Sequence, residues 1–219
     1  MRLAIGDVHG RDFWKRCINR DFTEFYVLGD YFDSLELPYR KQYRNFMELA
    51  ERAREDRRIK LCLGNHDYHY LPEVKERYSG YQESRCREIG QILEKNLDLI
   101  RVVYVTAGNL IISHAGVSAW FMKRMEEAGY AGPEDINRAF AEDPSALSFN
   151  GENYFGDDVT QSPLWIRPAS LELQPVPGYS QIAGHTPVEE ISSISLRDSE
   201  GGLITITYID TCGKSVYSF

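Results

Sequence analysis

Five short apolar runs constrain this chain more than any other feature, because each ends in a turn that carries potential metal ligands. The five turns are Gly6-Asp7-Val8-His9-Gly10, Gly29-Asp30-Tyr31-Phe32-Asp33, Gly64-Asn65-His66-Asp67, Ser113-His114-Ala115-Gly116 and Gly184-His185-Thr186. An apolar run that ends at Gly predicts a buried strand followed by a sharp turn. Ligands gather at the carboxyl ends of strands in sheets that helices cover. We therefore expect these Asp, His and Asn side chains to converge on a metal site.

The segments between the turns alternate between helical and extended patterns. Helical spacing or helix-start signals occur at 11–19, 39–58, 85–97, 119–128 and 134–140. Further strands are predicted at 101–106, 110–113, 191–196, 203–209 and 216–217. Strands first alternate with helices and then follow one another. This order predicts an α/β (α+β) fold with two packed mixed β-sheets flanked by helices.

The stretch from 143 to 177 breaks this pattern. It is rich in Gly, Pro, Asn and aromatic residues and has no clear period. Long irregular segments inside a compact domain are usually functional or disordered, and the aromatic residues favour an ordered segment. We therefore expect one domain over 1–219 with an irregular substrate-side insertion at about 143–177.

The composition is ordinary for a globular protein, with 42% hydrophobic and 26% charged residues. Four cysteines are scattered without a CxxC pair, which favours reduced thiols and a cytoplasmic location. No apolar run approaches the roughly 18 residues of a membrane span, and the first strand begins too early for a signal peptide. The net charge of −8 disfavours an extended nucleic-acid surface but allows phosphate substrates, because bound dications dominate a local field.

The side chains at the turns suit transition metals. Asp7 and His9 are two residues apart, so they share one face at the end of an extended segment. Carboxylate with imidazole suits Mn, Fe or Zn, and the lack of a Cys pattern argues against a structural zinc site. Four more donors complete the set: Asp30, Asn65, His114 and His185. Six donors are too many for one catalytic ion with an open position, and they suit two ions about 3.5–4 Å apart with a bridging carboxylate.

Taken in order, the five turns resemble those of the calcineurin-like metallophosphoesterases. The shared patterns are Gly-Asp-x-His-Gly, Gly-Asp-x-x-Asp, Gly-Asn-His-Asp, Ser-His-Ala-Gly and Gly-His-Thr. The resemblance runs from residue 5 to about residue 212 and includes Ile209-Asp210-Thr211. It is closest to the branch of the Ser/Thr phosphoprotein phosphatases and of the bacterial and phage enzymes that cleave diadenosine tetraphosphate. One tetrapeptide would be weak evidence, whereas five in order are specific.

The resemblance implies a calcineurin-like αββα sandwich that holds two metal ions, with Mn²⁺ expected and Fe or Zn as alternatives. One ion would be held by Asp7, His9 and Asp30, and the second by Asp30, Asn65, His114 and His185. Asp30 would bridge the ions, and a hydroxide between them would attack phosphorus in line, without a covalent enzyme intermediate. His66 would protonate the leaving oxygen, and Asp33 would orient the His66 ring and raise its basicity.

Two arginines are candidate clamps for the substrate phosphate, because a guanidinium binds two phosphate oxygens at once. Arg167 lies in a Leu-Trp-x-Arg segment that resembles the family, and Arg11 follows the first turn. The chain departs from the phosphoprotein phosphatases at Ser34, where their pattern Gly-Asp-x-x-Asp-Arg-Gly has an arginine that binds phosphoryl oxygens. We expect this clamp to be missing or to be supplied by Arg40 or Arg44.

Other side chains near the motifs have local explanations. His69 lies outside every motif and is predicted to be a loop residue, and Asp67 is predicted to be a turn residue rather than a partner of a ligand. Three aromatic residues in the irregular segment could stack a nucleotide base, although core or lid packing explains them equally well: Tyr154, Phe155 and Trp165.

The leading hypothesis is therefore a hydrolase of phosphomonoesters, including phosphoproteins. The alternative is a pyrophosphohydrolase or phosphodiesterase that acts on dinucleotide polyphosphates or other nucleotides. A non-catalytic scaffold is disfavoured, because the chain keeps His66, Asp33 and every ligand position. The expected partner is a phosphorylated substrate, with neither a membrane nor an extended nucleic-acid surface.

Overall fold

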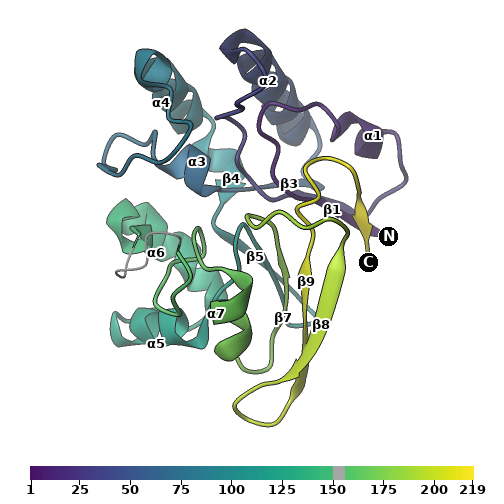
Figure 1. Ribbon diagram of the computed structural model, residues 1–219, viewed down its shortest axis with the longest axis vertical. Coiled ribbons are helices and arrows are strands. Elements are labelled where there is room, and N and C mark those ends of the chain that lie inside the picture. Colours follow the sequence, from purple (N-terminus) through teal and green to yellow (C-terminus); the bar gives the residue numbers. More distant parts are fainter. Residues whose placement is uncertain (150–155) are drawn as a thin grey trace.

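The computed structural model describes residues 1–149 and 156–219, whose strands form two five-stranded sheets (Figure 1). The first sheet has the order β10-β1-β2-β3-β4, with β1 (Arg2–Ile5), β2 (Glu24–Val27), β3 (Ile59–Cys62), β4 (Ile100–Arg101) and β10 (Tyr217–Ser218). The second has the order β5-β6-β7-β9-β8, with β5 (Val103–Thr106), β6 (Leu110–Ser113), β7 (Ser180–Ala183), β8 (Ser192–Arg197) and β9 (Leu203–Tyr208). Parallel pairs form the centre of each sheet, and antiparallel β10, β5 and β8 lie at edges, so both sheets are mixed.

Helices gather along the two sheets (Figure 1). Beside the first lie α1 (Lys15–Ile18), α2 (Tyr39–Glu55) and α4 (Cys86–Lys95), and beside the second lie α5 (Ala119–Glu127), α6 (Ile136–Glu142) and α7 (Pro168–Leu173). The short α3 (Asn65–Tyr68) follows β3, and 3-10 turns occur at Glu83–Arg85, Leu97–Leu99, Pro133–Asp135 and Pro144–Leu147. The predicted fold class, two packed mixed sheets flanked by helices, is confirmed. None of the described helices is long and apolar enough to cross a membrane.

The structure differs from the predicted elements in three places. The predicted strand 101–106 is divided at Val102, because β4 ends the first sheet and β5 begins the second. The helix predicted at 11–19 is only one turn long, over Lys15–Ile18. Within the stretch 143–177, which was expected to be irregular, a 3-10 turn follows Asp143 and α7 begins at Pro168, a residue favoured at the first helical position.

Side chains along β1 and β2 alternate between two buried layers. Leu3 and Phe25 belong to the cluster that also contains the core-facing residues of α2, whereas Ala4 and Tyr26 pack with Ile112 of the second sheet. This alternation follows from the two-residue period of a strand. Both faces of the first sheet are therefore buried.

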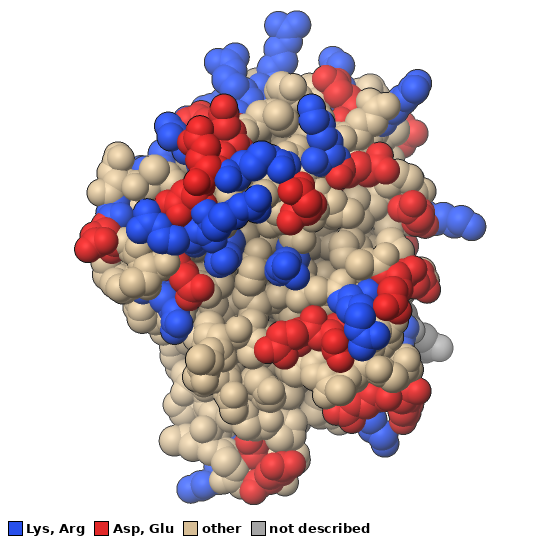
Figure 2. All heavy atoms as spheres, turned by 180° about the vertical axis from the view of Figure 1, so that it is seen from behind, with Lys and Arg blue, Asp and Glu red and all other residues tan. Residues whose placement is uncertain are grey.

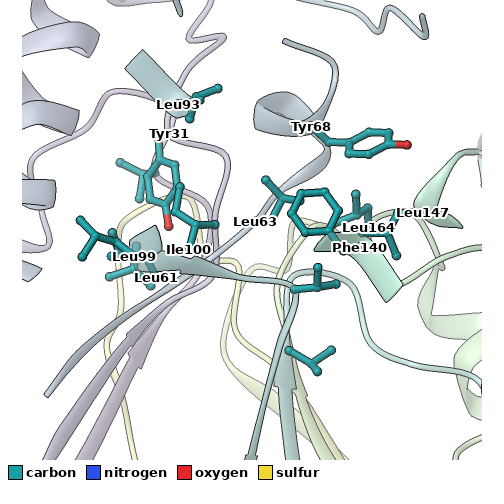
Figure 3. Packing of buried hydrophobic residues seen from close by; sticks show 14 of the residues in the cluster. Tyr31, Leu61, Leu63, Tyr68, Leu93, Leu99, Ile100, Phe140, Leu147 and Leu164 are labelled. Atoms are coloured by element: carbon teal, nitrogen blue, oxygen red, sulfur yellow. The ribbon is translucent and has the colours of Figure 1, made fainter. Parts of the chain in front are cut away.

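The ring of Tyr31 anchors the turn that follows β2. It lies among Leu61, Leu99 and Ile100 (Figure 3), and its hydroxyl donates a 2.7 Å hydrogen bond to the carbonyl of Cys62. Each apolar side chain buried in such a cluster contributes about 1.5–3 kcal/mol. The anchor fixes the neighbouring Asp30 at the end of the sheet.

Charged side chains of both signs are intermixed on the face opposite to that of Figure 1. Lys and Arg side chains lie among Asp and Glu side chains across the upper part of this face (Figure 2). Acidic residues outnumber basic ones, 33 to 25 in the whole chain. Although the net charge is negative, side chains of both signs lie close together on this part of the surface.

Candidate metal centre and active site

All the predicted ligands lie in turns directly after strands. Asp7 and His9 follow β1, and the strands that precede the other four ligands are β2 for Asp30, β3 for Asn65, β6 for His114 and β7 for His185. Three of these ligands have left-handed backbones, with φ of 42° at His9, 53° at Asp30 and 61° at His185. A non-glycine residue in this region costs about 1–3 kcal/mol and persists only where its neighbours hold it. Here the turns hold one another, since the backbone N–H of His9 donates to the carbonyl of Asp30 at 2.6 Å.

Glycines in two of the turns leave room for carboxylate oxygens. A Cβ atom at Gly184 would lie 2.7 Å from Oδ1 of Asp7, and a Cβ atom at Gly64 would overlap Oδ1 of Asp30. Any side chain at either position would displace the carboxylate. At these two positions, the absence of a side chain makes room for a predicted ligand from a different turn.

Three of the predicted ligands converge around the imidazole of His114. Its Nε2 lies 2.9 Å from Oδ1 of Asn65, 3.1 Å from Nδ1 of His185 and 3.7 Å from Oδ2 of Asp30. Its Nδ1 donates to the carbonyl of Leu28 at 2.7 Å, and burial lowers the pKa of His114, so the ring is neutral and Nε2 bears only a lone pair. Two acceptors, Nε2 and the Asn65 oxygen, thus face each other, an arrangement that a cation would stabilise.

The second group of ligands lies on the other side of Asp30. Nδ1 of His9 donates to the carbonyl of Phe32 at 2.9 Å, and its Nε2 lies 3.6 Å from Oδ2 of Asp30. Asp7 is held by the backbone N–H of His185, which donates to its Oδ1 at 3.0 Å. Asp7, Asp30 and His114 each offer a ligand atom within 4.8 Å of the others. Oδ2 of Asp30 is therefore near both groups of donors.

Buried negative charge is concentrated at this site. Four carboxylates are at most 3% exposed: Asp7, Asp30, Asp67 and Asp210. Burial, followed by the charges of Asp210 and Asp30, raises the pKa of Asp7. Buried charges in proteins are generally paired or coordinate metals. The residues present therefore fit bound metal cations, both in the chemistry of their donors and in their charge.

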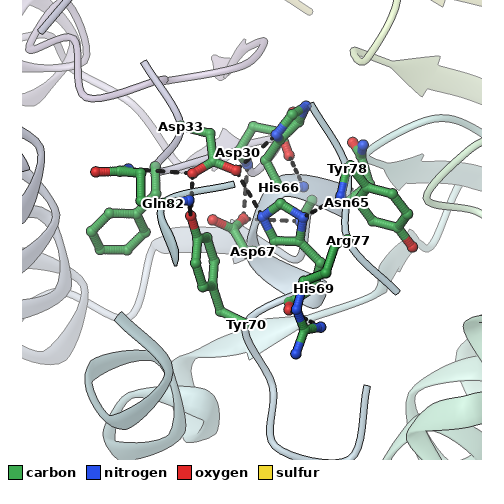
Figure 4. Close-up of polar contacts among 12 residues, drawn as sticks. Asp30, Asp33, Asn65, His66, Asp67, His69, Tyr70, Arg77, Tyr78 and Gln82 are labelled. Carbon is green, nitrogen blue, oxygen red and sulfur yellow. Dashed lines mark hydrogen bonds and ion pairs between the residues drawn. The ribbon is translucent and has the colours of Figure 1, made fainter. Parts of the chain in front are cut away.

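Asp67 is more than the turn residue predicted from the sequence, so that prediction is wrong. Its Oδ2 accepts hydrogen bonds from the backbone N–H groups of Asp30 at 2.8 Å and Gly64 at 3.1 Å, and its Oδ1 accepts one from Tyr31 at 2.8 Å (Figure 4). The carboxylate ties the turn after β3 to the turn after β2. It thereby places Asp30.

The predicted pair of His66 and Asp33 is formed. Nδ1 of His66 lies 3.0 Å from Oδ2 of Asp33, and the backbone N–H of His66 donates to Oδ1 of Asp30 at 2.9 Å (Figure 4). Burial lowers the pKa of His66, but the charge of Asp30 and the hydrogen bond with Asp33 outweigh burial and raise it.

His69, predicted to be a loop residue, is fully buried beside this pair. Its Nε2 lies 2.7 Å from Oδ2 of Asp33. The other carboxylate oxygen accepts hydrogen bonds from Oη of Tyr70 at 2.5 Å and from Nε2 of Gln82 at 3.3 Å (Figure 4). The spacing of His69 three residues after His66, which places both on one side of a helical turn, is the signal that could have identified it. Nothing in the sequence pattern indicated Tyr70 or Gln82.

A pocket of about 290 Å³ opens beside the site. It is lined by His9, Arg11, Asp33, Ser34, Leu35, Glu36, His66, Ser79 and Gly80. Arg11, a candidate phosphate clamp, lines this pocket, and its Nη2 lies 3.8 Å from Oε2 of Glu36. Arg167 lies beside the turn after β7, where its Nη1 donates to Oγ1 of Thr186 at 3.1 Å and to the carbonyl of His185 at 3.4 Å.

Ser34 stands where the related phosphatases have an arginine after the aspartate. The hydroxyl of Ser34 accepts from the backbone N–H of Leu37 at 3.1 Å, so this residue shapes the turn. Arg40 and Arg44 line a different hollow, together with Asp12. The suggestion that either of them replaces the missing clamp is therefore not supported.

The aromatic residues of the irregular segment were candidates for stacking a base. Trp165 is 9% exposed and packs edge-on against Tyr78 and Phe149, with ring centroids 4.4 and 5.0 Å apart. It is therefore a core residue with little free ring surface. Tyr154 and Phe155 lie outside the described residues.

The chain resembles known proteins in sequence pattern and in fold. The family model for calcineurin-like phosphoesterases matches residues 2–189. The crystal structure of the cold-active protein-tyrosine phosphatase of a psychrophile, a Shewanella species, is 16% identical and has a TM-score of 0.63, over 98% of this chain and 73% of that one. Another structure of a cold-active protein tyrosine phosphatase is 17% identical and has a TM-score of 0.57, over 98% of this chain and 72% of that one.

These structures are too distant in sequence to show more than a shared fold. No curated protein sequence matches the chain. The family match, by contrast, covers most of the chain and includes all five ligand-bearing turns. This protein therefore belongs to the calcineurin-like phosphoesterase family and is a metal-dependent phosphoesterase.

Proposed function

We propose that this enzyme hydrolyses phosphomonoesters and that it uses two transition-metal ions, for which Mn²⁺ is the first candidate. The observation that carries the proposal is the position of Asp30, whose Oδ2 lies 3.6 Å from Nε2 of His9 and 3.7 Å from Nε2 of His114. Asp7 would complete the group of His9, and Asn65 and His185 would complete that of His114. When bound, two such ions lower the pKa of a water nucleophile and neutralise the phosphoryl oxygens.

His66 is the general acid of the proposed reaction. Its Nδ1 is held by Asp33, which leaves Nε2 free in the pocket to donate a proton to the leaving oxygen. The raised pKa favours the protonated ring that a general acid needs, although bound cations would oppose the shift. General acid catalysis typically contributes about 10²–10⁴-fold to the rate.

The pocket supports a phosphomonoester better than a dinucleotide. Its volume of about 290 Å³ is at the lower end of the range for small-molecule sites, roughly 300–1,000 Å³. The burial of Trp165 removes a described aromatic ring that could have stacked a base. Leu35, which is 92% exposed at the rim, offers apolar surface to the group that carries the phosphate, as a phosphopeptide side chain would require.

A substrate panel with added Mn²⁺ tests the class of reaction. It contains p-nitrophenyl phosphate, its bis-ester, phosphopeptides and dinucleotide polyphosphates. We expect turnover of the monoesters to exceed that of the bis-ester and the dinucleotides, and all activity to disappear with a chelator. Faster turnover of the dinucleotides or the bis-ester would replace the proposal with the pyrophosphohydrolase or phosphodiesterase alternative.

The variant His66→Asn tests the role of the general acid. It should retain metal and lose turnover, by about 10²–10⁴-fold for an alkyl phosphate and much less for p-nitrophenyl phosphate, whose leaving group departs as an anion. The variant Asp30→Asn serves as the comparison, since it should lose metal and activity on both substrates. Equal losses of both substrates in His66→Asn would show that His66 is not the acid, and metal loss in it would make His66 a ligand.

A further inference from the structure

The carboxylate of Asp33 is held from several sides. Besides His66, it contacts Tyr70 and Gln82 through Oδ1, and Nε2 of His69 lies 2.7 Å from its Oδ2 (Figure 4). Burial raises the pKa of Asp33, but its contacts with His66, His69 and Tyr70 outweigh burial and lower the pKa to about 2. Asp33 is therefore ionised, and two histidines share one of its oxygens.

The hydrogen bonds of His69 define its tautomer. Its Nδ1 accepts a hydrogen bond from the backbone N–H of Tyr78 at 3.2 Å, so Nδ1 carries no proton. Burial lowers the pKa of His69, so the ring is neutral and its one proton is on Nε2. This N–H lies close to Asp33 but does not point straight at its oxygen. It therefore interacts with the carboxylate as a dipole with a charge, and not as a well-aligned hydrogen bond. A ring with this proton has no lone pair to offer a metal ion between Asp33 and His66.

Aromatic rings confine His69. It stacks on Tyr78 with centroids 5.0 Å apart and meets Tyr70 and Tyr81 edge-on at 4.4 and 4.9 Å. It also lies edge-on to His66, with centroids 5.6 Å apart. The ring is therefore a rigid support that contacts both Asp33 and His66.

We propose that His69 is a positioning residue for proton transfer: its Nε2–H holds the oxygen of Asp33 that orients the imidazole of His66. The inference rests on the proposed function, because it acts through His66. Loss of the Nε2–H lets Asp33 and His66 turn away from the leaving oxygen. The effect falls on substrates that need a proton, while substrate binding and the metal ligands are unchanged.

The variant His69→Phe keeps an aromatic ring and removes the N–H. We expect kcat for an alkyl phosphate to fall about 10- to 100-fold, part of the range of general acid catalysis, with KM and metal content unchanged. For p-nitrophenyl phosphate we expect less than about a threefold fall in kcat. His69→Gln, which can place an amide N–H near Nε2, should recover most of the loss. His69→Leu serves as a second variant if His69→Phe does not fold, as judged by circular dichroism.

A matched control and a double mutant separate positioning from a structural role. Tyr68→Phe removes a neighbouring buried hydroxyl that donates to the carbonyl of Pro144 at 2.8 Å, and it should affect both substrates equally and slightly. In the His66→Asn background, His69→Phe should cause no further loss, because the two residues act through one proton transfer.

Equal falls on both substrates in His69→Phe, or a full further loss in the His66→Asn background, would overturn the inference. A leaving-group effect in His66→Asn but not in His69→Phe would overturn it alone and leave the proposed function standing. The absence of that effect in His66→Asn itself would overturn both.

Discussion

Substitution of Asp67 tests how the two metal-bearing turns are held together. Its carboxylate is 0% exposed and accepts three backbone hydrogen bonds, from Asp30, Tyr31 and Gly64. Asp67→Ala leaves three buried N–H groups without an acceptor, and each such group costs about 1–3 kcal/mol. The expected loss of about 3–9 kcal/mol is comparable with the whole stability of many domains, about 5–15 kcal/mol.

Asp67→Asn gives a graded version of the same change. Its single carbonyl oxygen can replace Oδ2, which serves the N–H groups of Asp30 and Gly64, and then only the N–H of Tyr31 is left unpaired. We therefore expect a loss of about 1–3 kcal/mol, roughly a third of that in Asp67→Ala.

The assay is urea unfolding of the metal-free protein, followed by tryptophan fluorescence, so that metal binding does not add to the measured stability. The control is Asp143→Asn, since this exposed carboxylate also accepts a backbone N–H, from Ser145 at 2.9 Å, and Asn caps about as well as Asp. It should change the free energy of unfolding by at most about 0.5 kcal/mol. Asp67→Ala within about 1 kcal/mol of wild type, or equal losses in both Asp67 variants, would refute the reasoning.

Three further outcomes follow from the same site. Asp30→Asn should weaken the binding of both metal ions and Asn65→Ala mainly that of one, as measured by titration calorimetry with Mn²⁺. Weakening of only one ion by Asp30→Asn would contradict a shared Asp30, and equal weakening of both by Asn65→Ala would contradict the assignment of Asn65 to one ion. Hydrogen bonds lower the pKa of Asp33 to about 2, whereas the pKa of an aspartate in an unfolded chain is about 4. At a pH above about 4, its charge should therefore stabilise the metal-free fold by about 2–3 kcal/mol, and this stabilisation should be lost as the pH falls through about 2. An equal cost of Asp33→Asn at pH 7 and pH 2 would exclude that contribution. Arg167→Ala should lower kcat/KM for a monoester about ten- to a hundredfold, and an unchanged value would remove Arg167 from the substrate site.

The sequence by itself determined the fold class and the set of candidate ligands, because both depend on local pattern. Asp7, Asp30 and His114 each follow an apolar run by one or two residues, and such a run predicts a strand that ends in a turn. Parallel strands carry their carboxyl ends to the same edge of a sheet. The convergence of ligands far apart in the chain therefore needed only the strands and their order.

The tertiary structure alone decided which residues support those ligands. Asp67 binds backbone N–H groups 36 and 37 residues away, and His69 meets Asp33 only because the turn after β2 lies against α3. Arg40, by contrast, was suggested as a clamp from the sequence, but it lines a different hollow in the structure. The hydrogen-bond partners of a buried polar side chain depend on how distant segments pack together. Such partners follow no periodic pattern, so the sequence does not predict them.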